Sequence, residues 1–340
     1  MSRDAEPRPP PPGHRPDVPC LVADIGGTHA RFGWLAGGEA PVAHVRILAA
    51  AGHAGMLEAA QAYLEGLRAQ LGEQFAPPVH ASLAVATAVV GDRIAFTNSH
   101  WSFSRRALQD ALSLQSLTVL NDFEALALAL PRLQASQMRL HGQPLRPGMP
   151  LAVVGPGTGL GVSCAVPHAG GWMALPGEGG HATLAAGDAF EDAVLAHARR
   201  EHPHVSAERL LSGTGLPLLH RAVSAAEGQS APTLDAPQIV AGGLAGEPRC
   251  QRTLEVFCAL LGSFAGNVAL TMGARGGLFV GGGLAPRLGD FFFRSAFRER
   301  FEAKGRLRPY LADIPTAVIT DPAAALAGAA TRLTAPGLNP

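Results

Sequence analysis

Residues 21–33 read LVADIGGTHARFG, an apolar segment that ends in a carboxylate and runs at once into two adjacent glycines and a threonine. Apolar residues on both sides of a glycine pair predict a strand, a tight turn and a second strand. Glycine has no Cβ, so the N–H groups of such a turn can approach an anion closely. The stretch therefore predicts a hairpin suited to binding phosphate.

The same pattern returns 130 residues later. Residues 151–163 read LAVVGPGTGLGVS, so that Leu151 corresponds to Leu21 and Thr158 to Thr28. A chain of 340 residues is too long for one typical core and indicates about two domains. The repeat predicts two similar domains, each offering a glycine–threonine turn to a shared cleft.

The order of the apolar segments predicts an α/β fold. Three short strands joined by glycine pairs come first, and helices alternating with strands follow, as in a domain with a mixed sheet. Strands are expected at 21–25, 30–35, 42–48, 81–86, 117–120, 277–280 and 316–319, and helices at 56–71, 104–112 and 123–130.

Composition excludes several classes of partner. Basic and acidic residues balance at 27 each, so no overall field favours nucleic acid or an anionic membrane. The four cysteines, at 20, 164, 250 and 258, lack the spacing of a metal site and fit a reducing cytoplasm. Residues 1–17 contain PRPPPPGHRP and predict a disordered, proline-rich tail.

Residues 256–274 carry no charge and have the length of a membrane span. Ser263, Asn267 and Thr271 recur at every fourth position, which gives a helix one polar edge. The segment is therefore expected to be a buried helix of a soluble protein.

Two common phosphate-binding motifs are absent. A Walker loop needs lysine before serine or threonine, but glycine follows Lys304, the one lysine of the chain. The dinucleotide fingerprint fails because Leu160, Val162 or Pro286 stands where its third glycine belongs. What remains is a phosphate clamp built from two hairpins, with Asp24 recruiting Mg²⁺, held through water. The alternative is that Asp24 simply caps a tight turn.

Polar residues cluster at four further places. Asn121 and Asp122 end an apolar strand just before a helix, where Asp122 either does chemistry or caps the helix. Glu178 and His181 stand among glycines, which suits a loop around a polyhydroxyl ligand. Glu208 follows a serine N-cap and could also serve the helix alone. The fourth place is the stretch FTNSHWSFS, which adds Asn98, His100 and Trp101 in an expected turn.

Taken together, these stretches resemble the bacterial glucokinases of the ATP-dependent, non-ROK type, within the hexokinase–actin-like superfamily. The resemblance covers roughly residues 20–335. It rests on seven motifs in the family's order: DIGGTHARF, TNSHWSFS, LNDFEA, GPGTGLGV, LPGEGGH, HVSAERLLSGTGL and FVGGGLAPR.

The resemblance implies ATP-dependent phosphorylation of the 6-hydroxyl of glucose, the first step of glycolysis, by a cytoplasmic homodimer that binds neither nucleic acid nor membrane. It implies two ribonuclease H-like (actin-like ATPase) domains with a ligand cleft between them, a small one at 18–131 plus 321–340 and a large one at 132–320. Asp122 would be the catalytic base, and the sugar would be bound by Asn98, Asn121, Asp122, Glu178, His181 and Glu208. ATP would be bound by Asp24, Ile25, Gly26, Gly27, Thr28, His29, Gly157, Thr158, Gly159, Gly282 and Gly283, with Mg²⁺ at Asp24.

The chain departs from the family's usual pattern at three positions. His29 stands where asparagine is usual, Pro156 where alanine is common and Thr214 where proline is common. These positions bear on nucleotide affinity rather than on the type of reaction. The cysteine cluster that binds zinc in ROK sugar kinases is absent, so no zinc is expected.

Two alternatives to a glucokinase remain. One is a kinase for another hexose, such as mannose or glucosamine, because these sugars differ from glucose at one carbon. The other is a sugar-sensing, non-catalytic regulator, which needs a helix-turn-helix module where this chain has a proline-rich tail.

Overall fold

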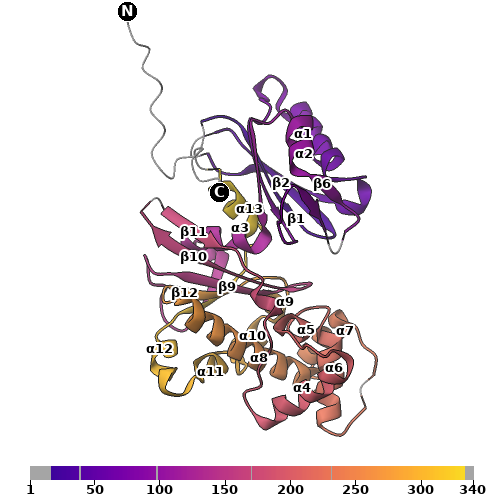
Figure 1. Cartoon of the computed structure of the whole chain (residues 1–340), viewed down its shortest axis with the longest axis vertical. Helices are drawn as coiled ribbons and strands as arrows, with labels where there is room; N and C mark the ends of the chain where they lie inside the picture. Colours follow the sequence, from indigo (N-terminus) through magenta and orange to yellow (C-terminus); the bar gives the residue numbers. More distant parts are fainter. Residues whose placement is uncertain (1–16, 38–39, 97–98, 170, 231, 334–340) are drawn as a thin grey trace, which may run out of the picture. The chain divides into compact units, whose positions relative to one another are not determined.

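The structure is a computed structural model of the chain, and it describes residues 17–37, 40–96, 99–169, 171–230 and 232–333. The chain forms two compact units (Figure 1). Unit 1 comprises Met1–Ala129, Pro167–Ala174 and Ala323–Pro340, and unit 2 comprises Leu130–Val166 and Leu175–Pro322. The domain boundaries expected at 131 and 320 stay predictions. The expected tail, residues 1–17, lies outside the described residues except for Asp17.

A five-stranded mixed sheet is the centre of unit 1. Its strands, in the order β3-β2-β1-β4-β7, are Ala43–Ala49, His29–Leu35, Cys20–Ile25, His80–Val85 and Ser116–Asn121. The first three pair antiparallel, and β1, β4 and β7 pair parallel. The predicted meander of three strands is thus confirmed. A separate two-stranded sheet pairs β5 (Arg93–Ala95) with β6 (Ser102–Ser104).

Helices cover both faces of this sheet. Alternate residues of β1 point to opposite faces, so Leu21 and Ile25 pack in one core with α1 (Met56–Leu71) and α2 (Arg105–Ala111), whereas Val22 packs with α13 (Ala324–Thr331). The helix α3 (Asp122–Ala129) packs with α13 on the second face. The two helices approach closely at Gly328, where a Cβ would collide with the carbonyl of Ala125. Asp24 is two residues after Val22 on β1, so its side chain points to the same face of the sheet, the face that α3 and α13 cover.

Unit 2 repeats the topology of unit 1. The second sheet has the order β11-β10-β9-β12-β13-β8, formed by Gly171–Leu175, Leu160–His168, Leu151–Pro156, Gly277–Val280, Thr316–Ile319 and Met138–His141. Of these strands, β11 lies almost wholly in the segment Pro167–Ala174 that belongs to unit 1. As β1 does in unit 1, β9 pairs antiparallel with the next strand and parallel with the strand beyond the first helices. The repeat at an offset of 130 residues marks the first hairpin of each sheet. The α/β fold with two mixed sheets is as predicted.

The helices of unit 2 build the larger core. They are α4 (Ala189–Glu201), α5 (Ala207–Leu210), α6 (Leu216–Ala226), α7 (Ala236–Leu244), α8 (Pro248–Met272), α9 (Leu284–Leu288), α10 (Asp290–Arg294), α11 (Phe297–Glu302) and α12 (Arg308–Ala312). Their apolar side chains pack together with one face of β9, β10 and β12.

The helix α8 is long and apolar enough to cross a membrane by composition alone. Most of its side chains are buried among α6, α7 and α11, as the sequence predicted for this segment. Gly262 and Gly266 face the carbonyls of Phe297 and Phe301, which lets the two helix backbones approach closely. The polar edge is exposed at Asn267 and Thr271.

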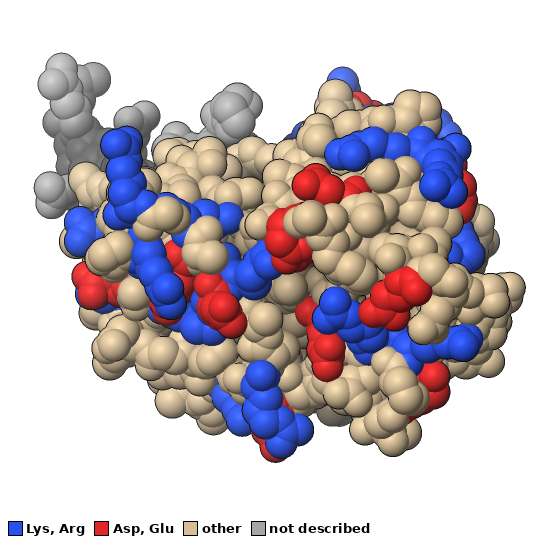
Figure 2. All heavy atoms as spheres, turned by 90° about the horizontal axis from the view of Figure 1, so that it is seen from below, with Lys and Arg blue, Asp and Glu red and all other residues tan. Residues whose placement is uncertain are grey.

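Charge is dispersed over the surface drawn in Figure 2, where basic and acidic side chains are interspersed. This distribution accords with the equal numbers of basic and acidic residues in the chain. All four cysteines are buried thiols.

The close contact of α8 with α11 gives a test of the fold. A Cβ at Gly262 would overlap the Phe297 carbonyl, so Gly262→Ala should lower the free energy of unfolding by about 1–3 kcal/mol. Asn267→Ala, on the exposed side of the same helix, is the control and should be neutral or slightly stabilising. Urea unfolding measures both, and a Gly262→Ala protein as stable as the parent would contradict the packing.

Candidate active site

The predicted site residues of unit 1 gather at one edge of its sheet. The strands β1, β4 and β7 are parallel, so their carboxyl ends meet at the same edge. The register pairs Asp24 with Ala84 and Val85 with Asn121. With β4 between them, β1 and β7 lie roughly 10 Å apart. Asp24, at the end of β1, and Asp122, just after β7, therefore share this edge.

Asp24 forms an ion pair that the sequence analysis missed. It stands opposite Arg31 in the β1–β2 hairpin, and Arg31 Nη1 lies 2.8 Å from Asp24 Oδ2. Burial raises the pKa of the Asp24 carboxyl, and the Arg31 cation opposes that shift. The signal for this pair was present in the sequence, because residues seven apart across a four-residue turn face each other in an antiparallel hairpin. Arg31 places a guanidinium beside the predicted phosphate turn.

The turn at residues 26–29 has open space beside Gly26. Gly26 N–H donates to the His29 carbonyl at 2.9 Å, and a Cβ on Gly26 would meet that oxygen at an ordinary 3.6 Å. Neither strain nor crowding therefore demands glycine at position 26. Thr28 and His29 are exposed, whereas the Ile25 side chain is fully buried in the core. The bare backbone at Gly26 favours a ligand over a purely structural turn.

Asn121 directly precedes helix α3, and its side chain caps the helix. Asn121 Oδ1 accepts from Phe123 N–H, the second N–H of the helix, at 2.9 Å. A side-chain oxygen that accepts from the second helical N–H acts as an N-cap. Asn121 Nδ2 also donates to the Thr87 carbonyl at 3.2 Å and so ties the loop after β4 to α3.

Asp122 is the first residue of α3, half-buried, and its Oδ1 also accepts from Phe123 N–H at 3.0 Å. Because Asn121 bonds the same N–H at a similar distance, the start of the helix does not depend on Asp122 alone.

The turn that carries Asn98 lies partly outside the described residues, because positions 97 and 98 are not described. The next residues are held by one acceptor: His100 Nε2 and Trp101 Nε1 lie 3.1 and 3.3 Å from the His53 carbonyl. Trp101 is buried in the core of unit 1.

In unit 2 the predicted phosphate turn is bonded to the helix that carries Glu208. Leu160 N–H, at the end of the turn, donates to Glu208 Oε2 at 2.8 Å. A Cβ on Gly159 would collide with that same carboxylate oxygen, so a side chain at this position would displace the Glu208 carboxylate. A Cβ on Gly157 would meet no atom within 4 Å, and this glycine resembles Gly26 in having open space before it.

A second pairing brings the predicted sugar-binding residues together. The 3₁₀ turn η5 (Gly179–His181) is followed by a segment that pairs with the residues just before α5, through Leu184 N–H to Val205 O and Ala207 N–H to Ala182 O. His181 consequently lies between two carboxylates, with Nε2 3.7 Å from Glu178 Oε2 and Nδ1 3.9 Å from Glu208 Oε1. All three side chains keep exposed surface, at 59% for His181, 60% for Glu178 and 32% for Glu208. They offer donors and acceptors suited to paired hydroxyl groups.

The glycine run at 281–283 lies beside the turn at residues 157–159. Strand β12 runs parallel to β9, and Gly281 N–H, just past its end, donates to the Val154 carbonyl at 2.9 Å. Gly282 has a φ of +72°, which favours glycine, and a Cβ there would crowd the Pro156 carbonyl. Gly283 has open space in front of it. The structure thus brings the glycines at 281–283 beside the end of β9, next to the turn at residues 157–159.

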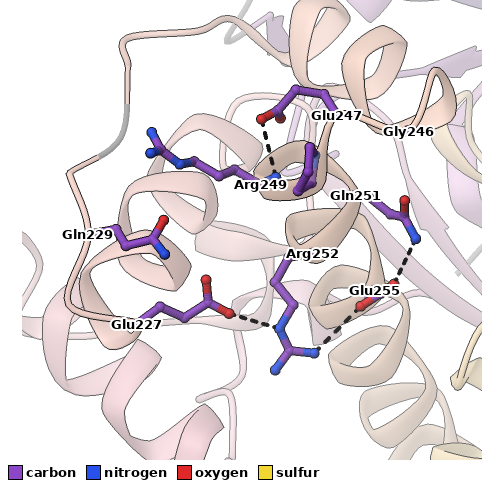
Figure 3. A pocket seen from close by; sticks show the side chains of 9 residues that line it. Glu227, Gln229, Gly246, Glu247, Arg249, Gln251, Arg252 and Glu255 are labelled. Atoms are coloured by element: carbon purple, nitrogen blue, oxygen red, sulfur yellow. Dashed lines mark hydrogen bonds and ion pairs between the residues drawn. The ribbon is translucent and has the colours of Figure 1, made fainter.

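A hollow of about 620 Å³ lies away from all these residues, at the amino end of α8 (Figure 3). Its charged side chains are paired among themselves, since Arg252 lies 3.2 Å from Glu227 and 3.6 Å from Glu255. Glu247 caps the helix by accepting from Arg249 N–H and Cys250 N–H. The exposed backbone donors of the helix end are thus already satisfied, and we assign the hollow no ligand.

Metal ligands are sparse in the part of the chain that the structure describes, which contains no group of three His, Cys, Asp or Glu side chains placed to hold an ion. Asp24 is a single carboxylate with one oxygen engaged by Arg31. That donor set fits an ion that keeps most of its water and is bound mainly through phosphate oxygens, as Mg²⁺ is in kinases. It does not fit a structural zinc site.

Comparisons with known proteins agree on one family. A family profile described as Glucokinase matches residues 21–336. A glucokinase from Chromobacterium violaceum is 48% identical over 317 residues, covering 93% of this chain and 89% of that protein. A glucokinase from Aromatoleum aromaticum is 49% identical over 325 residues, covering 95% and 97%. The crystal structure of a glucokinase from an Antarctic psychrotroph has a TM-score of 0.83 at 38% identity, covering 93% of this chain and 98% of that one.

The N-cap at Asn121 predicts unequal effects at two neighbouring residues. Asn121→Ala removes the cap and should lower the free energy of unfolding by about 1 kcal/mol. Asp122→Asn should change it by no more than about 0.5 kcal/mol, the size of a first-turn charge effect. Chemical unfolding measures the free energy of unfolding of both variants. A larger loss for Asp122→Asn than for Asn121→Ala would show that Asp122 has the structural role.

Proposed function

The chain belongs to the glucokinase family and is an ATP-dependent hexose kinase that phosphorylates glucose; on that premise we propose that Asp122 is the general base of the transfer. The observation that carries this proposal is the place of Asp122, directly after β7 at the carboxyl edge of the sheet, where Asn121 supplies an N-cap for α3. The Asp122 carboxylate would then serve the chemistry. It would accept the proton of the 6-hydroxyl as that oxygen attacks the terminal phosphoryl group of ATP.

The sugar would be held chiefly by Glu178, His181 and Glu208. His181 lies within 3.7 and 3.9 Å of the two carboxylates, so the three groups can meet neighbouring hydroxyls of one sugar, and each keeps exposed surface. Carboxylates accept from hydroxyls and the imidazole can donate, so neighbouring hydroxyls of a pyranose find complementary partners. Asn98 and Asn121 are proposed as further sugar contacts on the family's pattern, although Asn121 already uses both ends of its amide within the protein.

The phosphates of ATP would be held by the two glycine turns, at residues 24–29 and 157–159, with Gly282 and Gly283 near the nucleoside. Support comes from Gly26 and Gly157, where neither crowding nor strain requires glycine. Mg²⁺ would be held through water by Asp24 and would supply neutralisation of phosphate charge. Arg31 adds a fixed positive charge at the same edge and keeps one oxygen of Asp24 in place.

A cytoplasmic location and a homodimer are proposed from the family resemblance. The buried thiols support the first, because free cysteines in a core are typical of proteins from a reducing compartment. Size-exclusion chromatography with light scattering tests the second. The range of hexoses accepted, glucose alone or mannose and glucosamine as well, is tested by a coupled ATP-consumption assay with each sugar.

The base is tested by Asp122→Asn, which keeps the size of the side chain but cannot take a proton. General base catalysis is worth roughly 10²–10⁴ in rate, so kcat should fall by that order. Glucose affinity, followed by the fluorescence of the buried Trp101, should stay within about tenfold. Asp110→Asn, which removes an exposed carboxylate of α2, is the matched control. A variant that binds glucose and turns over within a few-fold of the parent would remove Asp122 from the mechanism.

The phosphate turn is tested by two alanine substitutions in the same loop. Gly157→Ala places a methyl group in open space and should raise the KM for ATP about tenfold without changing the thermal midpoint. Gly159→Ala collides with Glu208 and should lower stability and raise the KM for glucose as well. An unchanged KM for ATP in Gly157→Ala would show that phosphate does not approach this turn.

A further inference from the structure

The segment after α5 lies against the phosphate turn through its backbone. Gly213 N–H donates to the Gly157 carbonyl at 2.7 Å. The next residue, Thr214, donates twice to the Thr158 carbonyl, from its backbone N–H at 3.4 Å and from Oγ1 at 3.0 Å. Two successive carbonyls of the turn are therefore held from one side by two successive residues of the segment.

The Thr214 hydroxyl has a fixed direction. Gly215 N–H donates to Ser212 Oγ at 3.0 Å, and Ser212 Oγ lies 3.1 Å from Thr214 Oγ1. A hydroxyl has one proton, and that of Thr214 is used on the Thr158 carbonyl, so Ser212 must donate to Thr214. Ser212 is completely buried. The result is a directed chain of hydrogen bonds that ends on the turn.

The direction of a carbonyl decides the direction of the next N–H. In a planar trans peptide the two groups point opposite ways. Holding the carbonyls of Gly157 and Thr158 toward Gly213 and Thr214 therefore turns the N–H groups of Thr158 and Gly159 away from that segment.

These two N–H groups stay available in the described part of the chain. The other two of the turn are occupied, since Gly157 N–H donates to Gly159 O at 2.8 Å and Leu160 N–H donates to Glu208 Oε2. No described group accepts from Thr158 N–H or Gly159 N–H. Successive N–H groups that face outward form a concavity for an anion.

We propose that Thr214 is a positioning residue for ATP: it does not contact the nucleotide, but its hydroxyl holds the Thr158 peptide so that successive N–H groups face a phosphate. This inference rests on the proposed phosphate role of the turn. A proline at position 214 would have neither the hydroxyl nor the N–H that Thr214 uses.

The test is removal of the hydroxyl without change of shape. Thr214→Val keeps the branched side chain and should raise both the KM for ATP and the Kd for ADP, measured by calorimetry, about three- to tenfold. The KM for glucose and the thermal midpoint should stay unchanged. Thr214→Ser restores the hydroxyl and should restore both nucleotide constants. Thr271→Val, on the exposed side of α8, is the control and should leave them unaltered.

The outcomes separate this inference from the proposed function. If Gly157→Ala raises the KM for ATP and Thr214→Val does not, the turn binds phosphate and the positioning role is wrong. If neither variant changes the nucleotide constants, the phosphate role of the turn fails, and the inference fails with it. Equal rises in the glucose and ATP constants for Thr214→Val, or no recovery in Thr214→Ser, would mark the contact as merely structural.

Discussion

Backbone hydrogen bonding is the interaction on which the candidate site depends in each unit. Buried peptide groups must be paired, so the strands β1, β4 and β7 align in a register that brings Asp24 and Asn121 to one edge. In unit 2 the pairing of β9 with β12 brings the turn at 157–159 beside the glycines at 281–283 in the same way. The positions of these polar side chains follow from the formation of the sheets, because strand register fixes the edge at which the parallel strands end.

The polar side chains proposed to bind a ligand also bond the backbone. Asn121 caps α3 and ties down the loop after β4, and Glu208 accepts an N–H from the end of the phosphate turn. On the proposed sugar role, one oxygen of Glu208 would accept from a substrate hydroxyl while the other stays bonded to Leu160 N–H. Binding would then be coupled to the order of the turn. This coupling also means that loss of binding and loss of structure must be measured separately for each variant.

Most of the secondary structure could be predicted from local patterns. The helix at 56–71 and the strands at 277–280 and 316–319 have the predicted bounds, because apolar runs bounded by glycine or proline mark them clearly. The strands β5, β6, β8 (Met138–His141) and β11 were missed, and β8 shows the reason. It has two exposed residues, Arg139 and Leu140, and forms only by pairing with β13, whose partner for His141 is Thr316. A strand defined by so distant a partner leaves no local signal. The helix α3 begins one residue before its predicted start, at Asp122, because the cap belongs to Asn121.

The sequence by itself determined the repeated hairpins, the glycines at 26 and 157 and the polar residues proposed for the kinase site, because each of these is visible within a few consecutive residues. Only the tertiary structure decided which of those groups meet. Asn121 bonds a carbonyl 34 residues away, Glu208 an N–H 48 residues away and Thr214 a carbonyl 56 residues away. Contacts of that separation are set by strand register and helix packing, which depend on the whole buried core rather than on any local pattern.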